Sequence, residues 1–73
     1  MQKVVIQERT HLAHAIKKRR KELGLTQQQL ADLSNLSLNG ISQLEIGNKD
    51  TQLSTLLKLA PILGFKLTLD MDE

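Results

Sequence analysis

Two short helices are encoded back to back in TQQQLADLSNLSLNGISQLEIG, the segment from Thr26 to Gly47. Thr26 and Gln29 have the spacing of a capping box, in which each side chain satisfies a free backbone N–H of a helix's first turn. Ser37 is suited to cap a second helix, and Gly47 to end it, because glycine readily adopts the left-handed conformation that follows many helices. The segment therefore predicts two helices over residues 26–46, separated by a turn around Asn35.

Both predicted helices have one apolar side, which indicates packing against the rest of the chain. Helices this short are marginal on their own, so longer flanking helices must hold them. Two such helices joined by a few residues form the helix-turn-helix arrangement. The apolar positions of the first helix are Leu30, Ala31 and Leu33, and those of the second are Leu38, Ile41 and Leu44.

A longer amphipathic helix is predicted over residues 11–23, ahead of the pair. Thr10 is its expected N-cap, and Gly24 is its expected end. Arg19 and Arg20 lie at the borders of its apolar stripe, where each can bury its stem but needs an acceptor for its guanidinium. An acidic partner elsewhere in the chain is therefore expected.

A fourth helix is predicted after the pair, and it is closed by Gly64. Pro61 lies inside it, where proline removes a backbone donor and clashes with the preceding turn, so we expect a kink or an early end. The apolar stripe of this helix comprises Leu53, Leu56, Leu57, Ala60 and Leu63.

The tail changes period and predicts a β-strand over about residues 65–71, because apolar and polar residues alternate there. A lone strand needs a partner for its backbone groups, and the candidates are residues 4–6 of the same chain or the identical tail of a second chain. We favour a homodimer. The apolar positions that would form its interface are Phe65, Leu67, Leu69 and Met71.

The composition limits both the fold and the function. At 73 residues the whole chain, 1–73, is expected to be a single small domain. Without cysteine, and with only two histidines, neither a disulfide framework nor a metal site is expected, and no cofactor is implied. The lack of Trp and Tyr argues against stacking on single-stranded nucleic acid or RNA.

The same sequence gives no sign of a membrane protein or an enzyme. No apolar run is long enough to cross a bilayer, and the N-terminus lacks a signal peptide, which predicts a cytoplasmic protein. No Ser/His/Asp, Cys/His or paired-carboxylate arrangement has the geometry for catalysis. An enzyme is therefore not expected.

Asn39 and Gln43 lie one turn apart on the predicted helix that follows Ser37, which is the third helix along the chain. Both lie on the side opposite Ile41. Carboxamides on an outward helix face can bond adenine bidentately in the major groove of DNA. Exposed Asn and Gln are also common solubilising residues, so the surrounding pattern has to decide between the two interpretations.

The surrounding pattern resembles a family of helix-turn-helix regulators that includes phage Cro and repressor proteins and the Xre-like regulators. That family has LTQ-x-x-LA, a turn, and then IS-x-x-E-x-G. The resemblance covers roughly residues 12–65 and implies a compact, mainly α, four-helix fold of the phage-repressor type that binds specific double-stranded DNA. The matching positions are Leu25, Thr26, Gln27, Leu30 and Ala31, followed by Ile41, Ser42, Glu45 and Gly47.

The resemblance also implies roles for individual residues. Gln27 would clamp a phosphate at the positive end of its helix, with Gln28 beside it, and Lys49 in the following loop is a further candidate for phosphate contact. Glu45 would form a structural ion pair with Arg20. The candidates for contact with bases lie on the third helix, and they are Ser37, Leu38, Asn39, Ser42 and Gln43.

The ending LGFKLTLD resembles the antitoxins of the HipB type, whose short C-terminal strands pair across a dimer. This resemblance implies a dimeric repressor of its own toxin operon, which reads an inverted-repeat operator and binds a HipA-like kinase toxin. Two alternatives stay open. The chain could be a protein-interaction module that neutralises a toxin, or a phage or restriction-modification type Xre regulator that has no toxin.

Overall fold

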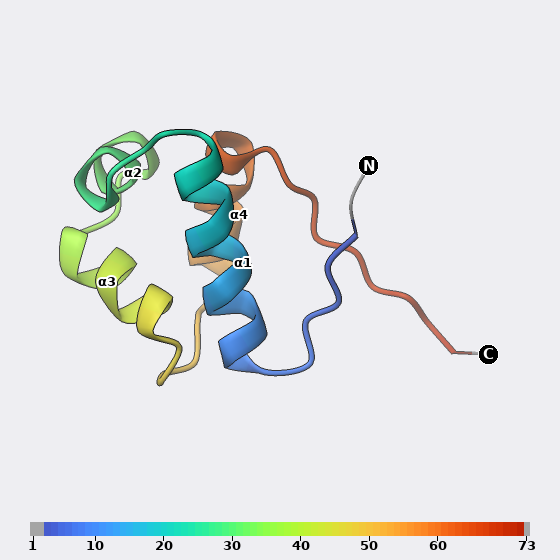
Figure 1. Cartoon of the computed structure of the whole chain (residues 1–73). Coiled ribbons are helices and arrows are strands. Elements are labelled where there is room, and N and C mark those ends of the chain that lie inside the picture. Colours follow the sequence, from blue (N-terminus) through green and yellow to red (C-terminus); the bar gives the residue numbers. More distant parts are fainter. Residues whose placement is uncertain (1–2, 73) are drawn as a thin grey trace.

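A computed structural model describes residues 3–72 of the chain and contains four α-helices (Figure 1). They pack into one helical body, with α2 and α3 on one side of α1, and both ends of the described chain on the other side (Figure 1). The mainly α, four-helix prediction is confirmed. The helices are α1 (Arg9–Glu22), α2 (Gln27–Ser34), α3 (Leu38–Ile46) and α4 (Leu53–Leu63).

Helix α1 begins earlier than predicted, and Thr10 is not its N-cap. The N-cap residue is Glu8, and the Thr10 hydroxyl donates to the Glu8 carboxylate at 3.2 Å instead of accepting from the backbone. The Glu8 carbonyl already accepts from the N–H groups of His11 and Leu12, at 3.1 and 3.4 Å, so the first turn begins there. Gly47 lies against this first turn. A Cβ atom added to Gly47 would lie 3.5 Å from the Cα atom of Thr10.

Helices α2 and α3 begin where local chemistry predicts. The Thr26 side chain accepts from the Gln29 N–H, and the Gln29 side chain accepts from the Thr26 N–H, which completes the capping box. Ser37 accepts from the Gly40 N–H at 2.9 Å and caps α3. Asn35 ends α2 in the left-handed conformation, with a φ of 57°.

Helix α4 does not end early at Pro61, so the early end is contradicted, while the expected kink stays a prediction. The helix continues to Leu63, and the Gly64 N–H closes its last turn on the Ala60 carbonyl at 2.8 Å. Pro61 lies in the last turn of the helix. Its missing N–H therefore removes a backbone hydrogen bond close to the point where the helix ends. Arg19 donates to the Leu63 carbonyl at 2.8 Å, so this arginine uses a helix end and not the acid that we expected.

The buried face of α4 also differs from the predicted stripe. Leu59 and Leu63 are fully buried, whereas Leu53 and Leu57 are 62% and 58% exposed. Leu33 of α2, another predicted core position, is 57% exposed. The buried core comprises Ala13 and Ile16 of α1, Leu30 and Ala31 of α2, Ile41 and Leu44 of α3, and Leu59 and Leu63 of α4.

Three apolar residues that come directly after helices complete this core. Leu25, Leu36 and Phe65 each donate a backbone N–H to the carbonyl five residues earlier, at 3.1, 2.9 and 3.1 Å. This bond reverses the chain after α1, α2 and α4, and it turns the following apolar side chain back onto the helices. Phe65 therefore packs on the core of its own chain, although it was predicted to lie in a dimer interface.

Beyond Phe65 the tail runs away from the helices as an extended chain (Figure 1). Residues 3–72 contain no assigned strand, and within this range no backbone hydrogen bond joins residues 4–6 to the tail. The predicted C-terminal strand is thus absent from the single chain, because its backbone groups have no partner there. Pairing across a dimer stays a prediction. No helix in residues 3–72 is long and apolar enough to span a membrane.

Replacing Thr26 by alanine is expected to lower the free energy of unfolding by about 1 kcal/mol, because the first turn of α2 loses an acceptor. Thr10→Ala is the matched control: Thr10 is exposed and caps nothing, so the change should stay within about 0.5 kcal/mol. Urea unfolding followed by circular dichroism measures both. Equal losses would show that the assignment of the two helix starts is wrong.

Candidate nucleic-acid interface

The outward face of α3 carries the residues that the sequence proposed for base contact. Ser37, Leu38 and Asn39 are exposed at the start of the helix, while Ser42 and Gln43 are half-buried one turn later. Leu38 is 43% exposed, so it does not belong to the core. The first turn of α3 therefore presents a mixed polar and apolar surface to solvent.

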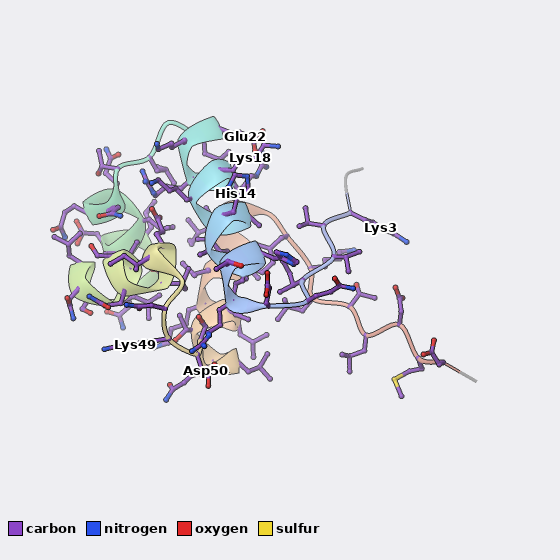
Figure 2. The ribbon with its side chains drawn as sticks, turned by 60° about the horizontal axis from the view of Figure 1, so that its bottom comes forward. Lys3, His14, Lys18, Glu22, Lys49 and Asp50 are labelled. Carbon is purple, nitrogen blue, oxygen red and sulfur yellow. The ribbon has the colours of Figure 1, made fainter. Side chains whose placement is uncertain are left out.

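Gln43 also lines an open groove between α3 and the loop that leads to α4. Lys49 and Thr51 line it from that loop, and Gly40 lines it from α3. Lys49 is an exposed residue of this lining, and its side chain is labelled in Figure 2. The groove thus places one cation beside the helix face that the sequence assigned to bases.

The loop that carries Lys49 is tied to the start of α1. Arg9 donates to the Asn48 carbonyl at 3.4 Å and lies 3.6 Å from the Asp50 carboxylate. Gly47 is buried against α1, and a Cβ there would lie 2.9 Å from that of Ala13. Sequence reasoning missed this anchor, since nothing in the local pattern links Arg9 to a loop so distant along the chain.

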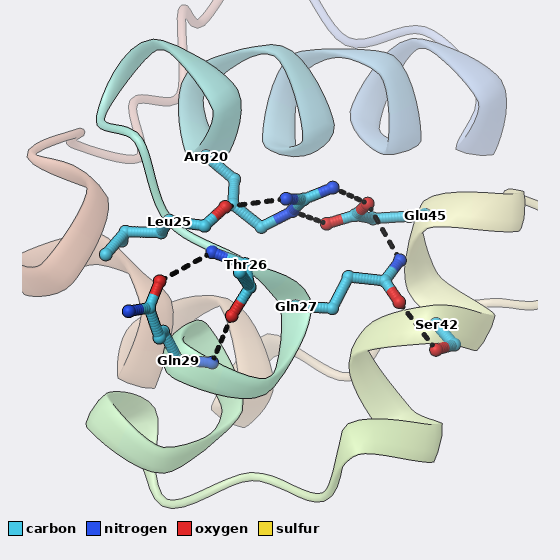
Figure 3. Close-up of polar contacts among 7 residues, drawn as sticks. All are labelled: Arg20, Leu25, Thr26, Gln27, Gln29, Ser42 and Glu45. Carbon is cyan, nitrogen blue, oxygen red and sulfur yellow. Dashed lines mark hydrogen bonds and ion pairs between the residues drawn. The ribbon is translucent and has the colours of Figure 1, made fainter.

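A buried ion pair joins α1 to α3, and Figure 3 shows its geometry. Arg20 donates from Nε to one Glu45 oxygen at 2.8 Å and from Nη2 to the other at 3.0 Å. A third donor, Nη1, reaches the Leu25 carbonyl at 2.7 Å. The two side chains are only 9% and 3% exposed. These bonds hold α3 against α1.

The electrostatics of Glu45 follow from this setting. Burial acts to raise the pKa of Glu45, but hydrogen bonds from Arg20 and Gln27, together with the Arg20 charge, outweigh it and hold the pKa below its usual value. The hydrogen bonds that Arg20 donates to Glu45 raise the pKa of Arg20 further above its already high value. Both groups are therefore charged at neutral pH.

Gln27 does not point freely toward solvent. Its Nε2 donates to Glu45 at 3.1 Å, and its Oε1 accepts from the Ser42 hydroxyl at 3.0 Å (Figure 3). Gln28, by contrast, is exposed and bonds Asp32 of its own helix at 2.9 Å. The Gln27 side chain thus lies between α2 and α3, where both of its polar atoms bond within the protein. The expected contact of this side chain with a phosphate did not anticipate these two bonds.

The remaining site residues lie elsewhere. Leu67, Leu69 and Met71 are 46%, 87% and 80% exposed on the tail, on the other side of α1 from α2 and α3 (Figure 1). Within residues 3–72, no three His, Asp or Glu side chains lie together as metal ligands would. Among the described residues, the candidates for base contact thus lie on α3, and the exposed apolar residues of the tail lie on the other side of α1.

A helix-turn-helix family model matches residues 16–69, which is most of the chain and includes all four helices in whole or part. The chain belongs to the Xre-type helix-turn-helix family of DNA-binding regulators. The resemblance stated from the LTQ-x-x-LA and IS-x-x-E-x-G positions is thereby confirmed.

Solved structures of HipB are similar to this regulator over its full length. One is described as a HipA-HipB-O2-O3 complex and another as a HipB-O4 20mer complex; each has 33% sequence identity, covers 100% of both chains and has a TM-score of 0.80. A chain described as "MDT Protein" matches with the same values. Among proteins with curated descriptions, none matches the sequence. The expected likeness to HipB is confirmed.

Substituting Glu45 by alanine is expected to lower the free energy of unfolding by about 3 to 5 kcal/mol, because it leaves the Arg20 guanidinium buried without its counter-charge. Glu22→Ala is the control, since Glu22 is an exposed acid at the end of α1, the helix that carries Arg20. Urea unfolding at neutral pH measures both variants.

The ion pair also predicts a pH dependence. Because the folded state lowers the pKa of Glu45, its contribution to stability is complete above the pKa of an unfolded glutamate and is lost as the pH falls through the lowered value. The stability difference between the wild type and Glu45→Gln should therefore shrink on acidification. A difference that stayed constant would contradict the assignment.

Proposed function

We propose that this protein is a sequence-specific, double-stranded-DNA-binding repressor that controls its own promoter as an antitoxin of the HipB type. The observation that carries the proposal is the outward face of α3, where Asn39 is exposed and Gln43 lies one turn behind it on the rim of the groove. The pair of Arg20 and Glu45 holds that helix rigidly, as base readout requires. Such a regulator acts in the cytoplasm, at the nucleoid.

The proposed roles on α3 follow from chemistry and exposure. Asn39 and Gln43 can each bond an adenine edge bidentately in the major groove. Leu38 can make only apolar contact, for which the methyl group of thymine is the fitting partner. Ser37 and Ser42 have hydroxyls that can bond base edges or phosphates. Together these residues would read a few neighbouring base pairs.

Phosphate contacts would fix the register of the helix on DNA. Lys49 lies in a loop anchored by Arg9, so its charge is held beside α3. Gln28 is exposed at the start of α2, where backbone N–H groups point outward and favour a phosphate. Gln27 contributes to the same end of α2 through its backbone, since its side chain is engaged internally.

We further propose a homodimer that reads an inverted repeat, with one recognition helix in each half-site. Its interface would be the tail, through Leu67, Leu69 and Met71, with Phe65 bridging from the core. DNA as a partner is supported by the similarity of this chain to the HipB structures described with operator DNA. The structure described as a HipA–HipB complex supports a HipA-like kinase toxin as the protein partner.

A second candidate function is neutralisation of a toxin by direct binding, with DNA binding absent. Exposed Leu53 and Leu57 on α4 favour it, because they give the helical body an apolar face away from the core. A regulator without a toxin, of the phage or restriction-modification type, is the other alternative. Both differ from the main proposal in the molecules that the chain binds.

The double substitution Asn39→Ala plus Gln43→Ala is expected to reduce specific binding to the chain's own promoter DNA by about 100-fold, because two base-reading amides are lost. Fluorescence anisotropy at a fixed salt concentration, against a scrambled duplex, measures it. Gln7→Ala is the control, since Gln7 is exposed in the segment before α1, which runs on the other side of α1 from α2 and α3 (Figure 1).

The fold of the double variant should be checked by its urea midpoint, which we expect to match the wild type. Retained specific binding would overturn the assignment of these two residues. Absence of specific binding by the wild type, together with co-purification of the neighbouring gene's product, would favour the toxin-binding module. Absence of that co-purification alone would favour a regulator without a toxin.

A further inference from the structure

The loop between α3 and α4, residues 47–52, carries two opposite charges side by side. Asp50 follows Lys49 directly, and these are the only charged residues of the loop, so by itself it has no net charge. Both residues line the groove beside α3. A phosphate that approached Lys49 would therefore also meet a carboxylate, and the two anions would repel each other. Lys49 attracts a phosphate effectively only if another group offsets Asp50.

Arg9 supplies that offset from the start of α1. Its Nη1 atom lies 3.6 Å from the Asp50 carboxylate and donates to the Asn48 carbonyl at 3.4 Å. One nitrogen thus contacts the residue before Lys49 and the residue after it. Asp50 also borders a second hollow, which Arg9 lines and Lys49 does not. Asp50 therefore lies next to Arg9 on one side of the loop and next to the α3 groove on the other.

Lys49 is left without an acid. Among the ion pairs within residues 3–72, Asp50 is paired with Arg9, and Lys49 takes part in none. Lys49 is exposed, and Figure 2 shows its side chain and that of Asp50 near one end of the helical body. The cation of the groove is thus available to a ligand although a carboxylate follows it directly in the chain.

The backbone of the loop is held at both ends independently of Arg9. Gly47 is buried against α1, where a Cβ would lie 2.9 Å from that of Ala13. Gln52 is the N-cap of α4. Loss of the Arg9 charge would therefore leave the loop in place and free the Asp50 side chain, which is 95% exposed and has little else to restrain it. The nearest cation along the chain is then Lys49.

We propose that Arg9 is a positioning residue for DNA binding, which holds the Asp50 carboxylate and so leaves the Lys49 ammonium free for a phosphate. Without Arg9, Asp50 and Lys49 neutralise each other. This role rests on the proposed DNA binding and deepens it, because it names the group that keeps one phosphate contact active. Arg9 itself does not touch the DNA. Since exposed ion pairs contribute little to folding, loss of this pair changes binding more than stability.

The salt dependence of binding tests this role, because the slope of log affinity against log salt reports the number of phosphates that the protein neutralises. Arg9→Gln removes the charge and keeps an amide that can donate to the Asn48 carbonyl. Affinity for the chain's own promoter duplex and for a scrambled duplex should fall by the same factor, roughly three- to tenfold, and the slope should become smaller by about one for each chain bound. Fluorescence anisotropy over a series of salt concentrations measures both quantities.

Removal of the carboxylate should rescue the variant. Asp50→Asn added to Arg9→Gln should restore the wild-type slope and most of the affinity, because no acid is left to neutralise Lys49. Asp50→Asn alone should bind within about twofold of the wild type, since Arg9 already offsets the carboxylate. A slope that stayed reduced in the double variant would overturn the proposed role and show that Arg9 contacts a phosphate itself.

Lys3→Gln is the matched control for the loss of one positive charge. Lys3 lies in the segment before α1, well away from Lys49 and Asp50 (Figure 2), so its slope should equal that of the wild type. An equal reduction of the slope in this control would overturn the local role, because net charge alone would then explain the effect.

A last comparison asks whether Arg9 acts through Lys49. Lys49→Gln should reduce the slope by about one for each chain bound, and adding Arg9→Gln should reduce it little further. Two equal, additive reductions would contradict a role through Lys49. Absence of any preference of the wild type for its promoter would overturn the proposed function instead, while the scrambled duplex would still report on Arg9. Urea midpoints of the variants separate all these results from loss of fold.

Discussion

The bonded pair of Arg20 and Glu45 is the constraint on which the arrangement of α1, α2 and α3 depends. It crosses from α1 to α3, and its third donor holds the Leu25 carbonyl at the entry to α2. One guanidinium thus fixes three segments at once. A domain this small buries few apolar residues, so a bidentate pair supplies geometric precision that packing alone would leave loose.

The turns at the helix ends provide further stabilisation. Each of α1, α2 and α4 ends in a turn that returns an apolar residue to the core, so short helices gain buried area beyond their own length. Arg19 adds a bond to the last carbonyl of α4. Helices that are marginal in isolation are stabilised here by these C-terminal turns as much as by their own apolar sides.

The features that could be predicted from the sequence are those set by interactions between residues close together in the chain. The capping box at Thr26 and Gln29 and the cap at Ser37 are local bonds, and they were predicted correctly. The start of α1 was predicted wrongly because the Glu8 carbonyl accepts the first helical bonds, while the Thr10 hydroxyl donates to Glu8 and caps nothing. Helical periodicity also placed Leu33 and Leu53 in the core, since a wheel gives the direction of a side chain but not the atoms that cover it. The engagement of Gln27 by both Glu45 and Ser42 needed the distance between two helices, which no local pattern contains.

The unpaired, extended tail has a consequence for how long a chain survives. Proteases bind their substrates as extended strands, and cleavage concentrates where backbone is exposed and free of hydrogen bonds. Residues 66–72 have that conformation in the single chain. If two tails pair, the cleavable conformation exists only in the monomer, and dilution alone would shorten the lifetime of the protein. Abundance would then control turnover through the same short segment that brings two chains together.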